Sequence, residues 1–446
     1  MTTETDKQLS LQRYRAAWRW HFYAGLVVLP FLLTLALTGL VMVYYSAVET
    51  PAGPSLNIAE GPGRQPAADL LQTAQQAVPG GDATQYIPAT TPGGSAQFVF
   101  DTPTGPRQLD LDPYRNEVLR NVLTDQTVYA WAHRIHGTLL LGDVGDFIVE
   151  TAAGLALLMV VTGLYMWCLR RKPGAGAESR RRRWRGLHLT TGVYAALGLC
   201  FFILSGLAWT NIWGGKLVQA WGSFPAEKWG PVELSQAPHA AMNHGSTKDV
   251  PWGLEQTPMP ESHGHRNTAT QQPQTLTEIE QRALALGFGP RYRINLPRDP
   301  QGVYTLSANS MSGDIDSPGQ ERTVHLDQYS GELLAEATFA DYSLLAKSMA
   351  LGVGLHQGSM GWWNSLLNAA ACLVVIVLCI SGIVMWWLRR PARTGALAPP
   401  PRAMGLPSRN SLTLILVLCA LAFPLLGLAL TAGWLIDRLL LLAQPA

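Results

Sequence analysis

Charged residues are scarce in this sequence. Lys, Arg, Asp and Glu make up 14% of its 446 residues, and hydrophobic residues make up 48%. Soluble domains usually contain about 25% charged residues, so the shortage indicates a membrane protein. The formal net charge is only +2, which gives no indication of nucleic-acid binding.

Cysteine is also rare, and two cofactor fingerprints are missing. The five cysteines all lie in or beside long apolar runs, so the connecting segments contain none that a disulfide could join. The motif C-x-x-C-H does not occur, which excludes covalently attached c-type haem. No G-x-G-x-x-G follows a predicted strand, so we do not expect the chain to oxidise NAD(P)H without a partner.

Five apolar runs are long enough to span a bilayer, which takes about 20 residues. Lys and Arg gather in three segments beside these runs, and the positive-inside rule places those segments in the cytoplasm. The predicted order is cytoplasmic residues 1–20, span 21–45, external domain 46–146, span 147–168, cytoplasmic loop 169–187, span 188–210, external domain 211–365, span 366–388, cytoplasmic loop 389–410 and span 411–436. The C-terminus is then expected outside.

The sequence repeats itself. Three positions of the first span recur 167 residues later in the third, where His21, Gly25 and Gly39 become His188, Gly192 and Gly206. The segment HGTLLLGDVGDFIVETAAGLALLMVVTGLYMWCLRR from His136 resembles HQGSMGWWNSLLNAAACLVVIVLCISGIVMWWLRR from His356. Because both halves run through the membrane in the same directions, four core helices are predicted to form a pseudo-two-fold repeat, with a fifth helix appended.

The two external segments have mixed local patterns. Helical spacing occurs at 68–78 and 275–288, and apolar residues alternate with polar ones over 96–114 and 302–334, as in strands. Between 222 and 270, Pro, Gly, His, Gln and Ser dominate, which predicts an irregular insertion. The predicted fold is therefore an all-α transmembrane bundle that carries two small α+β external domains.

Four histidines stand at the ends of these spans. The repeat places His21 and His188 at one depth near the cytoplasmic face, and His136 and His356 at one depth near the outer face. Ionisable residues in membrane spans mark functional sites by default, although a histidine at a boundary can also simply reach the lipid headgroups. We predict that each pair of imidazoles faces itself across the repeat axis.

Glycines beside the inner histidines favour a flat ligand. Gly25 and Gly192 follow His21 and His188 by four residues and share their helix faces, so the missing side chains leave a flat space beside each imidazole. Neutral imidazole is a common ligand of haem iron, whereas zinc requires four ligands in a tetrahedron. Two non-covalent b-type haems are therefore predicted, one for each histidine pair.

Two assignments near these histidines stay open. His133 lies three residues before His136 and could be the outer ligand in its place, although the repeat favours His136 because valine stands at position 353. Three arginines are placed to neutralise haem propionates: Arg19 and Arg185 on the inner side and Arg134 on the outer side. The topology rule alone also explains basic residues at these positions.

These motifs resemble a known family. They are H-x-x-x-G at the start of the odd spans, HRIHGTLLLG, GLHQG, VPWGLEQTPMP at 250–260, and the arginine pairs that end the even spans. Together they are similar to the PepSY-associated transmembrane family of bacterial iron-regulated inner-membrane proteins, up to about residue 390. The resemblance implies that the external domains are PepSY domains in the periplasm and that haem is ligated by His21, His188, His136 and His356.

The resemblance also implies a function. Members of the family act in siderophore-dependent iron uptake, and some are ferric-siderophore reductases with haem between the helices. The chain is therefore expected to pass electrons from a quinol, a reduced flavin or a partner reductase to Fe(III) held by a periplasmic siderophore, which releases Fe(II).

Other functions fit parts of the sequence. HAAMNHG at 239–245, Met259, His263 and His265 combine imidazole with thioether, which suits copper, or they belong to a mobile polar loop. A b-type cytochrome that serves quinone chemistry would use the same span histidines. PepSY domains are also associated with peptidase inhibition, so a membrane-anchored binding or regulatory protein without catalysis is a third alternative.

Overall fold

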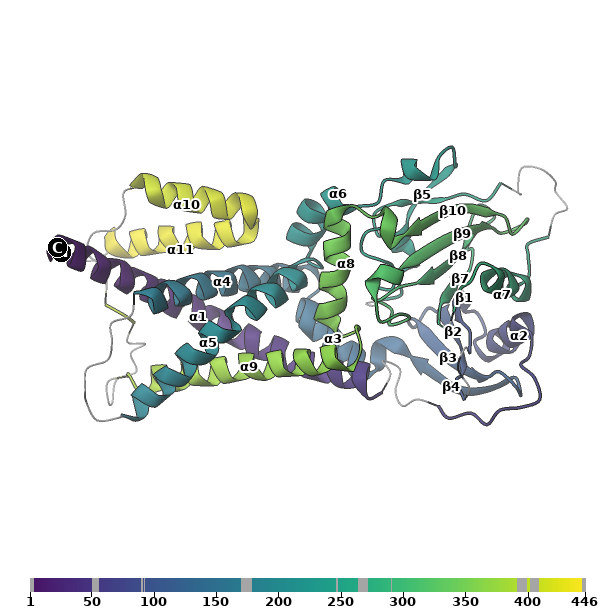
Figure 1. The fold of residues 1–446 in the computed structure, drawn as a ribbon, viewed down its shortest axis with the longest axis horizontal. Coiled ribbons are helices and arrows are strands. Elements are labelled where there is room, and N and C mark those ends of the chain that lie inside the picture. Colours follow the sequence, from purple (N-terminus) through teal and green to yellow (C-terminus); the bar gives the residue numbers. More distant parts are fainter. Residues whose placement is uncertain are drawn as a thin grey trace. The chain divides into compact units, whose positions relative to one another are not determined.

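Among the described residues of the computed structural model, four helices are long and apolar enough to cross a membrane (Figure 1). They are α1 (Glu4–Ala47), α4 (Asp143–Cys168), α5 (Arg180–Leu207) and α9 (Trp362–Trp387). At 1.5 Å per residue, the 26 residues of α4 or of α9 extend about 39 Å, more than the hydrocarbon core of about 30 Å. The helices agree with the first four predicted spans and continue into their polar flanks. The Ser179 hydroxyl, for example, accepts a hydrogen bond from the Arg182 N–H and starts α5 before its apolar run.

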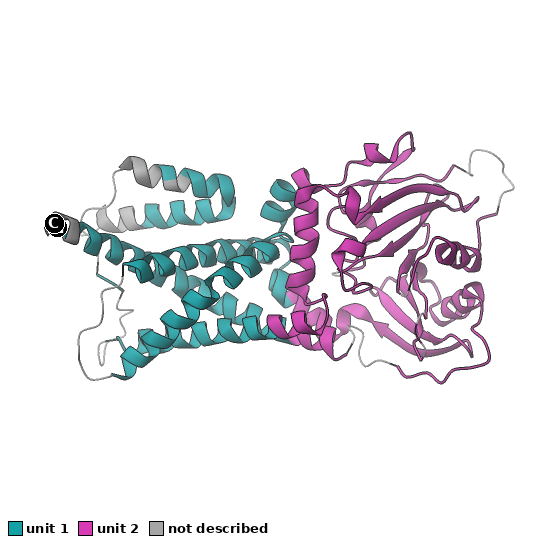
Figure 2. Cartoon of the chain, in the orientation of Figure 1, with its two compact units in different colours: residues 1–40, 135–218, 369–446 teal, residues 41–134, 219–368 magenta. Residues whose placement is uncertain are grey.

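The described residues fall into two units (Figure 2). We name the unit of residues 1–40, 135–218 and 369–446 the helical unit, and that of residues 41–134 and 219–368 the sheet unit. The structure describes residues 4–49, 56–89, 91, 93–169, 179–245, 248–263, 272–289, 291–390, 399–401 and 409–442. The predicted cytoplasmic loops 169–187 and 389–410 therefore lie partly outside the described residues.

The last apolar run, 411–436, does not form the single span predicted for it. It forms α10 (Arg409–Ala422) and α11 (Pro424–Leu442), which lie side by side as a hairpin (Figure 1). Proline disfavours the α conformation of the residue before it and lacks an N–H, so the helix stops before Pro424. A Cβ on Gly427 would lie 2.4 Å from the Ala420 Cα, so glycine permits this close approach. A hairpin reverses the chain, and the prediction of an external C-terminus loses its basis.

Two buried carboxylates of α4 hold the segment that follows α5. The first N–H groups of this segment, η2 (Asn211–Val218), have no acceptor within their own helix and need one from elsewhere. The Asp146 carboxylate accepts from the Asn211 N–H at 3.0 Å, and the Glu150 carboxylate accepts from the next two N–H groups at 3.3 and 3.2 Å. Trp213 of η2 then donates its indole N–H to the Ala422 carbonyl, which fixes the hairpin to this part of the helical unit.

One eight-stranded antiparallel sheet forms the centre of the sheet unit. Its order is β10-β9-β8-β7-β1-β2-β3-β4. The bounds are β1 Asp82–Ile87, β2 Ala96–Asp101, β3 Arg107–Asp112, β4 Glu117–Leu123, β7 Arg293–Asn295, β8 Val303–Ala308, β9 Arg322–Asp327 and β10 Leu333–Thr338. Each half is a meander of four strands that follows one helix, α2 (Ala67–Ala77) or α7 (Leu276–Ala285). The structure thus extends the sequence repeat to the fold of the external segments.

The two halves are not separate domains, which differs from the prediction. They join through β1 and β7, where Gln85 pairs with Asn295 and Tyr86 with Ile294 in antiparallel register. The Gln85 amide also donates to the Asn295 side chain at 2.9 Å. A four-stranded half alone would leave β1 or β7 as an unpaired edge, and pairing the two edges satisfies their backbone groups.

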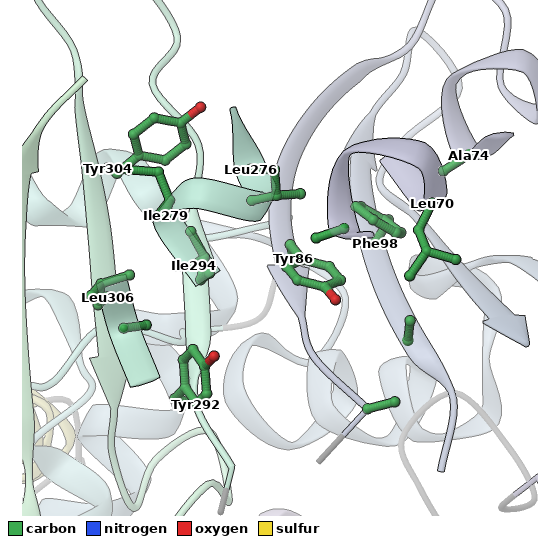
Figure 3. Packing of buried hydrophobic residues seen from close by; sticks show 14 of the residues in the cluster. Leu70, Ala74, Tyr86, Phe98, Leu276, Ile279, Tyr292, Ile294, Tyr304 and Leu306 are labelled. Atoms are coloured by element: carbon green, nitrogen blue, oxygen red, sulfur yellow. The ribbon is translucent and has the colours of Figure 1, made fainter. Parts of the chain in front are cut away.

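A shared hydrophobic core explains why the halves stay together. Leu70 and Ala74 of α2 pack with Ile279 of α7 over one face of the sheet (Figure 3). Tyr86 and Ile294, from the two joined strands, belong to the same cluster (Figure 3). The residues that alternate with these along each strand face the other side of the sheet.

The hairpin turns repeat as well. Asp112 ends β3, and its carboxylate accepts from the N–H groups of Tyr114 and Arg115 at 2.8 and 3.0 Å. Asp327 ends β9, and its carboxylate accepts from the N–H groups of Tyr329 and Ser330, both at 2.9 Å. The same Asp-x-Tyr turn therefore closes the same hairpin in both halves, as an aspartate that bonds its own backbone favours.

The remaining elements of the sheet unit flank the sheet. The helices are α6 (Gln219–Gly222), α8 (Leu344–Gln357) and the first part of α3 (Val128–Thr138), whose residues 135–138 belong to the helical unit. The 3₁₀ turns are η1 Thr124–Gln126, η3 Ala226–Trp229, η4 His239–Met242, η6 Pro318–Gln320 and η7 Phe339–Asp341. The predicted irregular insertion contains a two-stranded sheet of β5 (Leu234–Pro238) and β6 (Pro258–Pro260). Its residues 246–247 and 264–270 lie outside the described part.

Glu321 gives the sheet unit a testable pH dependence. Its carboxyl is 2% exposed, and burial raises its pKa to about 7 although the Ser310 hydroxyl and N–H donate to it. A raised carboxyl pKa stabilises the fold below the unfolded pKa, and this contribution is lost as the pH rises through the folded pKa. The stability contribution is therefore lost between pH 4.5, the usual pKa of a glutamate, and about pH 7.

We expect Glu321→Gln to unfold at a higher temperature than the wild type at pH 8.5 and at nearly the same temperature at pH 5. Gln stays neutral, so it avoids a buried charge that costs roughly 3 kcal/mol. Thermal unfolding in detergent micelles at the two pH values measures this difference. Glu117→Gln on exposed β4 is the matched control, and an equal shift for both variants would exclude the assignment.

Candidate functional site

His21 and His188 meet inside the helical unit. They come from α1 and α5, and their ring centroids are 6.4 Å apart with an interplanar angle of 88°. Two imidazoles bonded to opposite sides of one metal at about 2 Å each would have centroids roughly 6 Å apart. The predicted inner pair is therefore spaced as two axial ligands of a single metal ion would be.

A second helix fixes each of these rings. The Nδ1 atom of His21 lies 3.0 Å from the Met159 carbonyl oxygen and 3.2 Å from the Thr162 Oγ1 of α4. The Nδ1 atom of His188 lies 2.9 Å from the Ser381 Oγ of α9. A metal-binding histidine commonly has one ring nitrogen held in this way while the other faces the metal. In the inner pair, Nδ1 is the ring nitrogen that is held in this way.

His136 has the same kind of anchor in the helical unit. Its Nδ1 atom lies 3.0 Å from the Thr38 Oγ1 of α1. His133, in contrast, stacks on the Tyr129 ring in the sheet unit, with centroids 6.2 Å apart. Only His136 thus shares the hydroxyl contact of His21 and His188, which favours it over His133 as the outer ligand.

His356 lies in the last turn of α8, within the sheet unit. The Asn368 amide donates to its carbonyl at 2.7 Å and to the Leu355 carbonyl at 3.0 Å. Gly358 follows with a left-handed φ of 81° and ends the helix. These bonds fix the backbone of the His356 turn against the start of α9. The pairing of His356 with His136 stays a prediction.

The glycines next to the inner histidines do not provide the predicted flat space. A Cβ on Gly25 would lie 3.2 Å from the Met159 Cε, and one on Gly192 would lie 3.7 Å from the Leu378 Cδ2. Both glycines therefore face side chains of the neighbouring helices α4 and α9. The reason is that i and i+4 share a face only approximately, and here that face is used for helix packing.

Other glycines lie against the imidazoles instead. A Cβ on Gly163 of α4 would lie 3.3 Å from the His21 Cε1, and one on Gly382 of α9 would lie 3.9 Å from the His188 Cε1. A Cβ on Gly39 of α1 would lie 3.7 Å from the His136 Cε1. Sequence reasoning missed Gly163 and Gly382, although Thr-Gly and Ser-Gly at matching repeat positions were a usable signal.

The three predicted arginines have different surroundings. Arg19 donates to the Pro400 carbonyl at 2.9 Å and lies over the Tyr23 ring, so it is anchored in the helical unit. Arg185 is exposed near the start of α5. Arg134 belongs to the sheet unit, donates to the Asp125 carbonyl at 2.9 Å and lies over the Trp131 ring. Their predicted contact with propionates stays a prediction.

The histidines of the insertion bind separate partners. The Nε2 atom of His239 lies 3.0 Å from the Nε2 atom of His325, and both side chains are fully buried. Burial lowers the pKa of His239 to about 4 and that of His325 well below its usual value, so both are neutral at pH 7. His244 instead lies 2.8 Å from the Thr84 Oγ1.

His263 also has a separate partner, since its Nδ1 lies 3.8 Å from the Glu233 carboxylate. Met259 lies on β6, and His265 lies outside the described residues. Within the part of the chain that the structure describes, no three His, Cys, Asp or Glu side chains converge on one point as metal ligands. The described residues of this insertion therefore do not form a common ligand set that would support the copper hypothesis.

The donor set of the helical unit fits haem. It consists of two imidazoles with ring centroids 6.4 Å apart and a glycine of a neighbouring helix beside each ring. Two axial imidazoles complete the coordination of a haem iron, whose other four ligands come from the porphyrin. The residues present thus match what a b-type haem requires of a protein.

Comparison with known protein families gives one match that covers most of the chain. A family model described as PepSY-associated TM region matches residues 18–389, which include α1 from residue 18 onward, the other three long helices and both halves of the sheet. A comparison with curated proteins finds no match.

Proposed function

Because this chain is a membrane protein that belongs to the PepSY-associated TM family, we propose that it carries electrons across the bacterial inner membrane through two b-type haems. The proposed acceptor is Fe(III) in a siderophore on the periplasmic side. The observation that carries this proposal is the opposed pair of His21 and His188, with centroids 6.4 Å apart and each Nδ1 held by another helix.

The proposed roles of the residues follow from their positions. His21 and His188 would hold the inner haem, and His136 with His356 would hold the outer one. Haem supplies reversible one-electron chemistry at its iron, which amino-acid side chains cannot provide at a comparable potential. Met159 and Thr162 of α4 would hold the His21 ring in place, and Ser381 of α9 would hold the His188 ring.

The spacing along α1 supports two ligand positions at different depths in the membrane. His21 and Thr38, the anchor of His136, are both on α1 and are seventeen residues apart. At 1.5 Å per residue this separation is about 25 Å, close to the thickness of the hydrocarbon core of about 30 Å. The inner pair and His136 thus stand near opposite ends of the span, as an electron path through a membrane requires.

The proposed net reaction transfers one electron at a time. A cytoplasmic or membrane-pool donor, which is a quinol, a reduced flavin or a partner reductase, loses the electron, and siderophore-bound Fe(III) gains it to become Fe(II). Hard oxygen ligands bind Fe(II) more weakly than Fe(III), so the metal is released. The sheet unit, whose two segments follow α1 and α5, would be the PepSY-like part on the periplasmic side.

The electron-transfer step is tested on purified protein in detergent under anaerobic conditions. After reduction with dithionite and removal of excess reductant, a ferric trihydroxamate siderophore is expected to restore the oxidised haem spectrum and to give Fe(II) that a ferrous chelator traps. The gallium complex of the same siderophore is the control, because Ga(III) has the same ligands but accepts no electron. A reduced spectrum that persists with the ferric complex excludes the reductase, and a colourless protein favours the non-catalytic alternative.

A further inference from the structure

Each of the four long helices has a hydroxyl-glycine pair in the second half of its apolar run, and α5 also has Thr191-Gly192 near its start. The pairs in the second halves are Thr38-Gly39 in α1, Thr162-Gly163 in α4, Ser205-Gly206 in α5 and Ser381-Gly382 in α9. Thr38, Thr162 and Ser381 each contact a histidine of another helix, at 3.0 to 3.2 Å for the threonines and 2.9 Å for Ser381. In the same three pairs, the glycine is the residue whose Cβ would approach that histidine ring.

The hydrogen bonds of each hydroxyl determine which way the proton points. A Ser or Thr hydroxyl has one proton and two lone pairs. Thr162 donates to the Leu158 carbonyl at 2.7 Å, Thr38 to the Thr34 carbonyl at 2.8 Å and Ser381 to the Leu378 carbonyl at 3.0 Å. A hydroxyl that donates to its own helix keeps its oxygen lone pairs for the imidazole, and we infer that Nδ1 donates to it.

This arrangement fixes one tautomer of each imidazole. Nδ1 carries the proton, and a neutral ring then has its free lone pair on Nε2. The Met159 carbonyl, which can only accept, lies 3.0 Å from the His21 Nδ1 and requires the same tautomer. The lone pair that would bind a haem iron is therefore positioned by the partner helix and not by the helix that carries the histidine.

We propose that Thr38, Thr162 and Ser381 are positioning residues for the haem ligands. Each fixes the Nδ1–H tautomer of one imidazole, and the following glycine leaves room for the ring. The inference rests on the proposed haem function and extends it to residues that do not touch the metal. A donated Nδ1–H bond makes the imidazole more basic and stabilises the ferric state, so its loss raises the reduction potential.

The test compares hydroxyl variants with matched controls on the same helices. Thr162→Val and Ser381→Ala are expected to raise the midpoint potential of the inner haem only, and Thr38→Val that of the outer haem only. Loss of such an outer-shell partner commonly lowers metal-site affinity by about 10- to 100-fold, so faster haem transfer to apomyoglobin is expected too. Thr162→Ser keeps the hydroxyl and is expected to restore the wild-type values.

Two threonines serve as controls. Thr151 of α4 and Thr34 of α1 donate only to carbonyls of their own helices, at 2.7 and 2.9 Å. Thr151→Val and Thr34→Val are therefore expected to change neither potential. If the hydroxyl variants retain wild-type potentials and haem transfer rates, or if the controls shift equally, the positioning role is excluded.

A second measurement separates this inference from the haem proposal. Nitrogen NMR of protein with ¹⁵N-labelled histidine, stripped of any haem, reports which ring nitrogen carries the proton. The Nδ1–H tautomer is expected at His21, His136 and His188, and Ser381→Ala is expected to populate the other tautomer at His188. An Nε2–H tautomer in the wild type overturns the inference even where haem binds, whereas a wild type that never binds haem overturns the proposed function.

Glycine variants give a graded result from the same contacts. Gly163→Ala would place a Cβ 3.3 Å from the His21 ring, which is tighter than ordinary contact, whereas Gly382→Ala would place one 3.9 Å from the His188 ring. Gly163→Ala is therefore expected to disturb inner-haem binding more than Gly382→Ala. Both substitutions raise helix propensity, so a loss of folding does not explain the difference. The reverse order would contradict the role assigned to Gly163.

Discussion

Purified protein with His21→Ala is expected to lose half of the haem of the wild type, and so is protein with His188→Ala. The two ring centroids lie 6.4 Å apart, and we propose that they hold one haem, so removing either ring would leave that haem with one protein ligand. The double variant of both residues is expected to lose no more haem than each single variant. A combination of His21→Ala with His136→Ala is expected to lose both haems. Pyridine haemochrome quantification per protein measures these ratios.

The outer ligand is decided in the same experiment. His136→Ala is expected to remove the other half of the haem, and His133→Ala is expected to retain both halves because His133 stacks on Tyr129 and lacks the hydroxyl contact. His356→Ala tests the predicted partner of His136. Full haem occupancy in the His21, His136, His188 and His356 variants would refute the ligand assignment, and loss of haem in His133→Ala alone would move the outer site to that residue.

Gly145→Ala is expected to damage the outer site more than any substitution outside the ligands. A Cβ at this position would lie 1.6 Å from the Thr138 carbonyl oxygen, which is main-chain and has no flexible side chain to move aside. The turn before it already holds Leu139 and Leu140 at left-handed φ values of 51° and 62°. The turn must therefore open, at a cost on the order of 3 kcal/mol.

The expected effect of Gly145→Ala on haem binding is confined to the outer site. Thr138 ends α3 two residues after His136, so opening the turn displaces His136 from Thr38. We expect loss of the outer haem and a lower unfolding temperature, with the inner haem retained. Gly137→Ala is the control, because a Cβ there meets nothing within 4 Å although it lies next to His136. Wild-type stability and haem content in Gly145→Ala would show that this turn does not position His136.

Local patterns predicted much of the fold because the relevant forces act over a few neighbouring residues. Apolar runs of about 20 residues predicted the four long helices, and i, i+4 spacing predicted α2 and α7 almost to their ends. The prediction of a single span for the last apolar run was wrong because Pro424 interrupts the helix. A hydropathy pattern alone does not reveal this break. Strand β7, only three residues long, carried too little alternation to be recognised.

The site was predicted in part. His21 and His188 were identified as a pair from the repeat alone, and the structure brings their rings together. Gly25 and Gly192 were predicted to leave a flat space beside the imidazoles, but they face Met159 and Leu378 of neighbouring helices. Spacing along one helix does not show which neighbouring helix fills the space beside it. Thr162 and Ser381 were missed because they lie more than a hundred residues from the histidines they contact.

The sequence by itself determined that the chain belongs in a membrane, that it is built as a repeat, and that histidines stand at the ends of its spans. These properties follow from composition and local periodicity, which each segment carries independently of its neighbours. Only the tertiary structure decided that two external segments share one sheet and that hydroxyls of α4 and α9 orient the imidazoles of α1 and α5. Strand pairing and helix packing depend on which distant surfaces meet, and no single segment contains that information.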